Sequence, residues 1–336
     1  MKVLFIGGTG LISKEVSKAA VEGGIELYLL NRGNRKSFVP EGAKVIYGDI
    51  NNRKEMNALL DKQHFDVVVN WIVFKELDIE RDIAYFTGKT DQYIFISTVA
   101  TYQRPPHHYM VDESTPQHNP WWEYASDKIA CEDRLRQEFR ENDFPMTIVR
   151  PSHTYGNTSI PFAVTSGEHP WTLIDRIING KKIIVPGDGS SLWTITHNTD
   201  FAKGLVGLLG NSQTIGEAFQ ITSDEVKTWD QYLGLLGQAV GVKPRIMHMT
   251  SECISLFMPE FKGSLFGDAS TSYVVDNSKI KSFVPSYQAT TNFEDGIQES
   301  ITYFRENPEL QTIDDELNVK MDNAIAIYEA FLSQIK

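Results

Sequence analysis

Tyr124 and Lys128 stand four residues apart in a segment, residues 122–128, whose pattern predicts a helix. Both side chains should therefore project from one helix face. A tyrosine hydroxyl has an ordinary pKa of about 10, so it exchanges protons with a substrate alcohol at neutral pH only when a nearby cation stabilises the phenolate. Lys128 is suited to be that cation. The alternative is a surface helix in which this spacing has no chemical role.

The N-terminal segment offers a partner for this chemistry. Residues 3–6 form a short apolar run typical of a buried strand, the sequence GGTGLIS follows at residues 7–13, and a helical pattern extends to residue 22. Strand, glycine turn and helix are the context of a dinucleotide-binding fingerprint, because glycines let backbone N–H groups approach a pyrophosphate at the helix N-terminus. Ser13 stands where a third glycine is usual. A tight turn without a ligand is the alternative.

The end of the second predicted strand, residues 26–30, indicates which dinucleotide would bind. NAD-selective folds place an acidic residue there for the ribose 2′-hydroxyl. This chain has Asn31 and Arg32, with further basic residues at Arg35 and Lys36. Cationic donors suit a 2′-phosphate, so we predict NADP as the cofactor, with NAD as the alternative. A solvated basic loop would explain the same residues without a ligand.

Further strands are predicted at residues 43–47, 66–71 and 93–97, with helical connections between them. This alternation predicts an α/β fold with a doubly wound parallel sheet. Ligands of such sheets bind beyond the carboxyl ends of the strands. The glycine turn, Asn31, Asp49, Asn70 and the segment 97–98 should therefore meet at one edge.

Composition limits the classes of function. The chain has 336 residues, 32 Lys and Arg against 44 Asp and Glu, and a net charge of −12. This charge opposes binding to nucleic acid or to anionic membranes. The two cysteines, Cys131 and Cys253, lack metal-ligand spacing, so no metal site is expected. With no signal peptide or membrane-spanning run in the sequence, we expect a cytoplasmic protein that acts on a small molecule.

Several motifs occur together in order: GGTGLIS at 7–13, GDI at 48–50, ISTVATY at 96–102, Tyr124 with Lys128, RPSHTYG at 150–156, PGDG at 186–189, HNTDFA at 197–202 and GEAFQIT at 216–222. In these motifs the chain resembles the extended short-chain dehydrogenase/reductase superfamily, specifically its NAD-dependent epimerase/dehydratase branch. The resemblance covers nearly the whole chain and implies a Rossmann domain with a smaller C-terminal substrate-binding lobe.

The resemblance also implies roles for particular residues. Thr98 would be the catalytic Ser/Thr, Tyr124 the acid/base and Lys128 its partner, and Asp49 would meet the adenine. The predicted cofactor contacts are Gly7, Thr9, Gly10, Leu11, Ile12, Asn31, Arg32, Asp49, Ile50, Asn70, Lys128 and Pro151. Substrate contacts are predicted at His153 and Trp193.

Departures from the family pattern restrict the reaction. Family dehydratases carry an acidic pair directly after the Ser/Thr, whereas Val99 and Ala100 follow Thr98 here. A 4,6-dehydratase is therefore disfavoured. His153 replaces an asparagine of the substrate strand, and segment 191–194 lacks the arginine that usually serves a nucleotide diphosphate. A standard UDP-sugar pose is not expected.

We predict a Rossmann domain over residues 1–156, to which residues 194–223 return. Residues 157–193 and 224–300 should form the substrate-binding lobe, and residues 308–336 a helical extension. An apolar stripe from Ile313 to Leu332 would pack that extension on its own domain or form a subunit interface. The family often forms dimers, so a homodimer is an open alternative.

The predicted function is an NAD(P)-dependent oxidoreductase or epimerase that acts on a hydroxyl or ketone carbon of a sugar or sugar-nucleotide-like substrate. The sequence leaves open whether the enzyme is an epimerase or a reductase. The alternative is a non-enzymatic NAD(P)-binding or RNA-binding protein, because the chain also resembles chloroplast stem-loop RNA-binding proteins of the same branch.

Overall fold

The central sheet has seven parallel strands in the order β11-β7-β5-β4-β1-β2-β3. In the computed structural model, which describes residues 1–335, their bounds are β1 (Lys2–Ile6), β2 (Glu26–Asn31), β3 (Lys44–Tyr47), β4 (Phe65–Asn70), β5 (Thr90–Ile96), β7 (Met146–Pro151) and β11 (Ala218–Ile221). The strand order reverses between β1 and β4, which is the switch point where ligands of doubly wound sheets bind. The predicted fold class is confirmed.

Helices cover both faces of this sheet, which explains why its central strands are continuously apolar. One face packs against α1 (Ser13–Glu22), α6 (Asn198–Leu208) and α10 (Ser278–Phe283). The other face packs against α2 (Arg53–Leu60), α3 (Glu76–Phe86) and α4 (Glu123–Asn142). Alternate residues of β1 point to opposite faces, so Phe5 belongs to the first core and Leu4 to the second.

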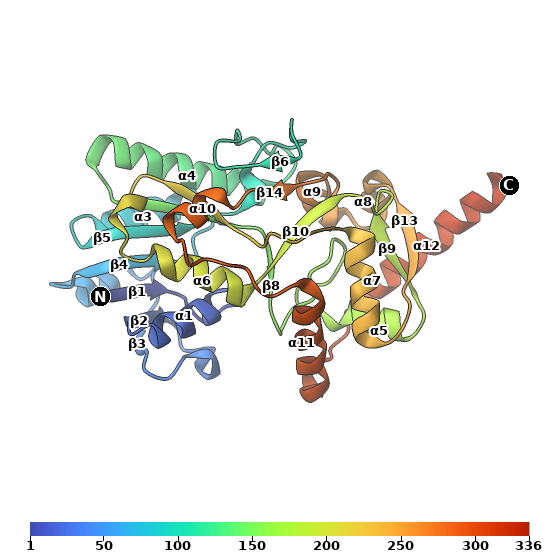
Figure 1. Ribbon diagram of the computed structural model, residues 1–336, viewed down its shortest axis with the longest axis horizontal. Coiled ribbons are helices and arrows are strands. Elements are labelled where there is room, and N and C mark those ends of the chain that lie inside the picture. Colours follow the sequence, from blue (N-terminus) through green and yellow to red (C-terminus); the bar gives the residue numbers. More distant parts are fainter. Residues whose placement is uncertain (336) are drawn as a thin grey trace.

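The second lobe lies beside the sheet and has its own apolar core (Figure 1). Its helices are α5 (Trp171–Ile178), α7 (Trp229–Val240), α8 (Ser251–Phe257), α9 (Lys262–Ser264), α11 (Phe293–Glu306) and α12 (Asp315–Ile335). Its short strands are β6 (Met110–Val111), β8 (His153–Tyr155), β9 (Lys182–Pro186), β10 (Leu192–His197), β12 (Val226–Thr228), β13 (Arg245–Met249) and β14 (Val274–Val275). A π-helical turn, Leu265–Ala269, follows α9.

Chain segments cross between the two lobes more than once. Residues 194–197 belong to β10, which pairs with β8 and β12 in a separate three-stranded sheet. The following helix α6 packs against the first lobe, and β11 pairs with β7 at the edge of the main sheet. The domain boundaries stay a prediction.

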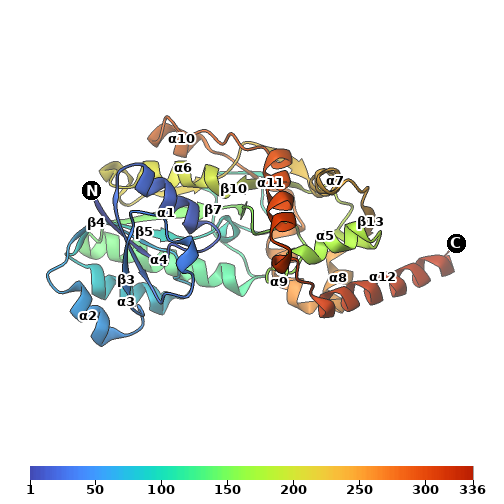
Figure 2. The same cartoon turned by 90° about the horizontal axis from the view of Figure 1, so that it is seen from below.

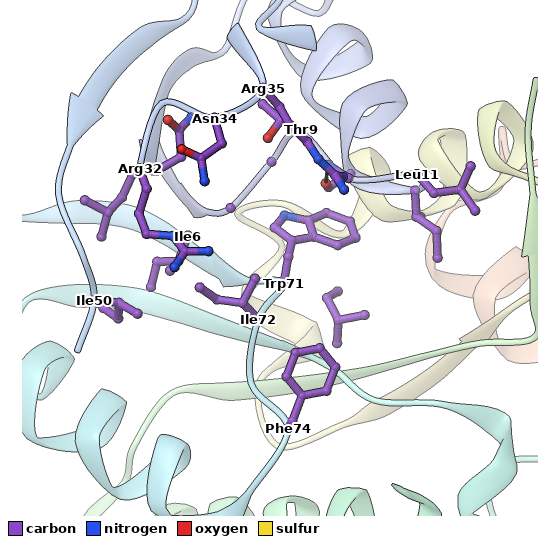
Figure 3. A pocket seen from close by; sticks show the side chains of 18 of the residues that line it. Ile6, Thr9, Leu11, Arg32, Asn34, Arg35, Ile50, Trp71, Ile72 and Phe74 are labelled. Carbon is purple, nitrogen blue, oxygen red and sulfur yellow. Dashed lines mark hydrogen bonds between the residues drawn. The ribbon is translucent and has the colours of Figure 1, made fainter. Parts of the chain in front are cut away.

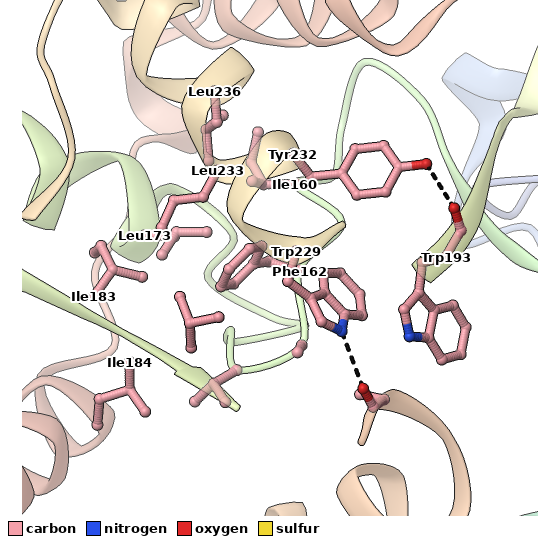
Figure 4. Packing of buried hydrophobic residues seen from close by; sticks show 14 of the residues in the cluster. Ile160, Phe162, Leu173, Ile183, Ile184, Trp193, Trp229, Tyr232, Leu233 and Leu236 are labelled. Carbon is pink, nitrogen blue, oxygen red and sulfur yellow. Dashed lines mark hydrogen bonds between the residues drawn. The ribbon is translucent and has the colours of Figure 1, made fainter. Parts of the chain in front are cut away.

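The core of the second lobe is rich in aromatic side chains (Figure 4). Trp193 and Trp229 lie with ring centroids 5.4 Å apart. The indole N–H of Trp229 donates to the carbonyl of Ala269, and the Tyr232 hydroxyl donates to the carbonyl of Trp193. These bonds attach α7 to β10 and to the π-helical turn, so the turn has a fixed position in the lobe.

The C-terminal helix α12 projects from the second lobe, as Figures 1 and 2 show. From the predicted stripe, Leu317, Met321 and Ile325 are buried on its own lobe, whereas Leu332 is 40% exposed. Lys336, the last residue of the predicted extension, lies outside the described residues. Within residues 1–335, no helix is both long and apolar enough to cross a lipid bilayer.

Candidate active site

The glycine turn between β1 and α1 has a backbone that requires glycine. Gly7 and Gly8 have φ angles of +99° and +92°, a region that side chains strain to enter. A Cβ on Gly8 would also lie 2.7 Å from the Leu29 side chain and 3.1 Å from Ser17 Oγ. The Ser17 hydroxyl donates to the Gly8 carbonyl at 2.8 Å. These contacts seat the turn directly on the start of α1.

The N-terminus of α1 remains open to a ligand. Ser13 Oγ accepts a hydrogen bond from the Gly10 N–H at 2.8 Å. Within the described chain, no side chain caps α1 itself. The free N–H groups of a helix N-terminus carry partial positive charge and bind phosphate. Ser13 therefore stabilises the turn, and α1 keeps the features of an anion site.

A cavity of about 750 Å³ extends from this turn along the carboxyl edge of the sheet (Figure 3). All residues predicted to contact the cofactor line it except Asn70. Tyr124 and Lys128, from α4, line it as well. The structure thus brings the glycine turn and the Tyr–Lys pair to one cavity.

The rim of the cavity near β2 is basic. Arg32 and Arg35 line it with Asn31 and Asn34, and Asp49, which follows β3, lines the same cavity. The Asn31 side chain accepts from the Gly33 N–H at 2.9 Å, and Asp49 accepts from the Asn51 N–H at 2.9 Å. The side chain of Arg32 is exposed to solvent. Two guanidinium groups are therefore available to an anionic group bound at this rim.

Helix α4 holds Tyr124 and Lys128 over the inner end of the cavity. The buried residues of α4 recur at helical spacing, among them Ala125, Lys128, Cys131 and Leu135. Lys128 is 3% exposed, and its ammonium donates to the backbone carbonyls of Val73 and Ile96 at 2.6 and 2.8 Å. It is thus anchored between the ends of β4 and β5.

Burial shifts the pKa values of both groups. Desolvation raises the pKa of Tyr124 to about 12, while a hydrogen bond with Thr98 acts in the opposite direction. Desolvation also lowers the pKa of Lys128 to about 8. Thr98 itself follows β5, and its hydroxyl oxygen accepts from the Ala100 N–H at 3.2 Å. Thr98, Tyr124 and Lys128 therefore lie together as predicted, although Thr98 is not among the described residues that line the cavity.

A buried ion pair fixes α4 to the sheet one turn beyond Lys128. Arg150 of β7 donates through Nε to Glu132 at 2.9 Å, and both side chains are fully buried. Desolvation raises the pKa of Glu132, but the charge and hydrogen bonds of Arg150 hold it below its ordinary value. Glu132 also accepts from the Ser97 hydroxyl. These bonds set the distance between α4 and the end of β5.

Asn70 does not fit its predicted role as a cofactor contact. It is fully buried at the end of β4. Its side-chain amide donates to Asp82 of α3, and its oxygen accepts from the Ile72 N–H at 2.9 Å. The side chain is therefore directed toward α3, because the buried Asp82 requires donors. The lining of the cavity near Asn70 comes instead from the next residues, Trp71, Ile72 and Phe74.

The two predicted substrate residues contact each other but do not line the cavity within the described chain. The His153 ring packs edge-on against Trp193 and Trp229, with centroids 6.0 and 6.1 Å away. Desolvation lowers the pKa of His153 to about 4, so its ring is neutral at pH 7. Trp193 is 1% exposed. Both residues pack in the aromatic core next to the site.

Sequence reasoning missed the loop after β4 and an ion pair between the two lobes. Trp71, Ile72 and Phe74 line the cavity (Figure 3). Their place directly after a predicted central strand was an available signal, since such loops lie at the ligand edge. Arg104 and Asp268 form a largely buried ion pair close to Tyr124. No local pattern connects positions so far apart in the chain.

Comparison with known proteins identifies a matching family and two similar curated proteins. Residues 3–222 match the model of the NAD dependent epimerase/dehydratase family. A chloroplast stem-loop binding protein of Arabidopsis thaliana is 25% identical over 74% of this chain and 65% of its own length. The 2′-dehydrokanamycin reductase of Streptomyces kanamyceticus is 22% identical over 72% of this chain and 67% of its own length.

A solved structure has the same fold. The UDP-glucuronic acid 4-epimerase of Bacillus cereus, in complex with NAD, superimposes with a TM-score of 0.72. The match covers 91% of this chain and 99% of that one at 20% identity. The two chains therefore share both lobes of the architecture.

Proposed function

The chain belongs to the NAD-dependent epimerase/dehydratase family, and from this premise we propose that it is a nicotinamide-dependent oxidoreductase or epimerase acting on a hydroxyl or ketone carbon of a sugar-like substrate. The observation that carries the proposal is that Tyr124 and Lys128 line the same cavity as the glycine turn. The relatives named above include a reductase, and the solved structure is an epimerase.

The residues of the cavity fit a dinucleotide. The uncapped N-terminus of α1 and the positive-φ glycines would receive the pyrophosphate. Asp49 and Lys128 line the same cavity. Asp49 would contact the adenine, and Lys128 would contact the second ribose. When bound, the nicotinamide would supply or accept the hydride.

Side chains of the protein would transfer the proton. The phenol of Tyr124 would give its proton to a substrate oxygen during reduction and take it back during oxidation. Thr98, whose side chain lies close enough to Tyr124 to lower its pKa, would hold that oxygen in line. Lys128 is the only cation that lines the cavity next to Tyr124 among the residues the structure describes. Its charge would stabilise the phenolate whenever the tyrosine has lost its proton.

We propose NADP as the preferred cofactor. Arg32 and Arg35 line the rim where a ribose 2′-phosphate would lie, and no acidic side chain follows β2 in residues 32–36. A guanidinium group matches phosphate with two parallel hydrogen bonds. The solved relative contains NAD, so the proposal of NADP for this chain rests on its basic rim.

A cofactor assay separates an epimerase from a reductase. The protein is purified without added cofactor and denatured, and the supernatant is assayed for NAD, NADH, NADP and NADPH. Retained stoichiometric cofactor supports an epimerase, because its cofactor returns to the starting state in each cycle. An empty protein that then binds NADPH in preference to NADH supports a reductase. An empty protein that binds neither contradicts the proposal.

Similarity to a stem-loop binding protein favours RNA binding as a second candidate function. The net charge of −12 opposes a large nucleic-acid footprint. Replacing Tyr124 by phenylalanine distinguishes the two functions. The loss of one hydroxyl should reduce catalysis by orders of magnitude, whereas RNA binding measured by filter retention should hardly change.

A further inference from the structure

Arg104 and Asp268 form an ion pair between the two lobes, close to Tyr124. Arg104 lies in the loop after β5 and is 2% exposed. Its Nη2 donates to Asp268 Oδ1 at 2.8 Å, and its Nε donates to the Gly267 carbonyl at 3.0 Å. The guanidinium group also lies 3.6 Å from the centroid of the Tyr273 ring. Asp268 is thereby held in one position by a nearly inaccessible partner.

The π-helical turn that carries Asp268 is attached to the start of α4. Asn119 donates to the carbonyls of both Ala100 and Gly267 at 2.7 Å. A Cβ on Gly267 would lie only 2.8 Å from the Trp122 side chain. The Trp122 ring in turn lies 5.0 Å from the Tyr124 ring. The turn and Tyr124 therefore both pack against Trp122.

The pair has hydrogen-bonding capacity that the protein does not use. Arg104 Nη1 is buried, and no acceptor for it exists within residues 1–335. Asp268 Oδ1 is bonded to Arg104, whereas no donor from the described chain reaches Oδ2. The Asp268 side chain keeps 17% of its surface exposed. The acceptor that a ligand can reach is therefore Asp268 Oδ2, and π-helical turns often mark functional sites.

We propose that Asp268 binds a hydroxyl group of the substrate next to the reacting carbon, and that Arg104 is a positioning residue for its carboxylate. This inference rests on the proposed function, and it specifies the substrate as an unphosphorylated polyhydroxyl ring at this place. A hydroxyl can donate to the partly exposed carboxylate of Asp268. The Arg104 side chain is inaccessible, so it acts only by holding that carboxylate in place. A phosphate dianion offers acceptors alone, so Asp268 repels it. The missing arginine in segment 191–194 agrees with this assignment.

The test uses the full chain loaded with its cofactor. The probes are methyl glycosides of the common hexoses and the matching hexose 6-phosphates, and binding is measured by ligand-observed NMR. We expect wild type to bind at least one methyl hexoside more tightly than its phosphate. Asp268→Asn should weaken the binding of that hexoside by about tenfold or more, because a charge-assisted hydrogen bond is lost. The same variant should bind the hexose phosphate more tightly, since the charge of Arg104 is no longer neutralised.

Two control variants and the cofactor measurement distinguish failure of this inference from failure of the proposed function. Asp230→Asn removes one carboxylate of an exposed pair with His248 in the same lobe and should leave both affinities unchanged. Asp268→Glu keeps the charge, so its affinity for the hexoside should equal that of wild type or lie between those of wild type and Asp268→Asn. This second variant keeps the test available if Asp268→Asn unfolds. Unchanged affinities in both Asp268 variants, or no hexoside binding by the loaded protein, overturn the inference. Failure to bind any nicotinamide cofactor overturns the proposed function instead.

Discussion

The ammonium of Lys128 lies 5.8 Å from the centroid of the Tyr124 ring. It is close enough for its charge to stabilise a phenolate, yet its hydrogen bonds go to the carbonyls of Val73 and Ile96. In the proposed mechanism the lysine would therefore act on a phenolate through its charge and not through a hydrogen bond. Its anchorage to two strand ends keeps that charge fixed in position.

Tyr124→Phe should reduce kcat by about 10²- to 10⁴-fold, the usual contribution of a general acid. The Kd for the cofactor should remain near the wild-type value, because the phenylalanine keeps the ring. Steady-state kinetics measures kcat, and cofactor fluorescence measures the Kd. Tyr109→Phe, at a 51% exposed tyrosine, is the matched control. Equal activity of both variants would exclude Tyr124 as the acid.

Arg32→Asp should weaken NADPH binding by about tenfold or more, because a charge-assisted bond is replaced by repulsion. NADH binding should stay equal or improve, since aspartate can bond to a ribose 2′-hydroxyl. Fluorescence titration with both cofactors measures the ratio. Arg140→Asp makes the same charge change on an exposed site of α4 outside the cavity. If Arg32→Asp leaves the ratio unchanged, the basic rim does not select the cofactor.

Gly8→Ala should destabilise the protein, because it combines backbone strain with a steric clash. The positive φ costs about 1–3 kcal/mol, and the contact of 2.7 Å with Leu29 adds to it. Gly24→Ala shares the positive φ, with nothing within 4 Å of its Cβ. The difference in free energy of unfolding between the two variants isolates the clash. Equal values would mean that β2 and the turn move apart at little cost.

Glu132→Gln should cost about 3–5 kcal/mol of unfolding free energy, because Arg150 is left buried without its counter-charge. Both side chains are fully buried in the wild type. Adding Arg150→Met should recover much of the loss. Glu26→Gln breaks an exposed pair with Lys44 and should leave stability nearly unchanged. Chemical denaturation provides these values, and a double variant less stable than Glu132→Gln would contradict the account.

His153 should make the protein lose stability in acid. Its pKa is about 4 in the folded chain, against an ordinary 6.5, because burial disfavours the charged ring. Between these two pH values the unfolded chain binds more protons, so the free energy of unfolding rises with pH and falls on acidification. His153→Phe should reduce this slope. His107→Gln, on an exposed loop, should keep it. Urea denaturation at pH 4.5 and pH 7 tests the difference.

Local signals in the sequence predicted the sheet and most of the cavity. The apolar runs of β1 and β4 mark buried strands, and the glycines before α1 mark the turn, because their backbone angles exclude other residues. Asn70 shows the limit of this reasoning. Its position at a strand end was right, but the direction of its side chain depends on Asp82, a buried acid on a later helix.

The residues on the substrate side of the site could not be predicted from the sequence. Arg104 and Asp268 are 164 residues apart in the chain, and neither lies in a recognisable motif. Their contact depends on how the second lobe closes over α4. Tertiary packing of this kind leaves no periodic or compositional trace.

The late position of β11 in the chain has a consequence for synthesis on the ribosome. Strand β7 is fully buried because β11 covers its outer edge, through pairs such as Ile148 with Ala218. While the segment 152–217 is being translated, nascent β7 presents an unpaired apolar edge. At about 5–20 residues per second this interval lasts on the order of several seconds. Such an edge can pair with other chains, so rapid overexpression should favour inclusion bodies, and chaperones that shield nascent chains should improve the yield.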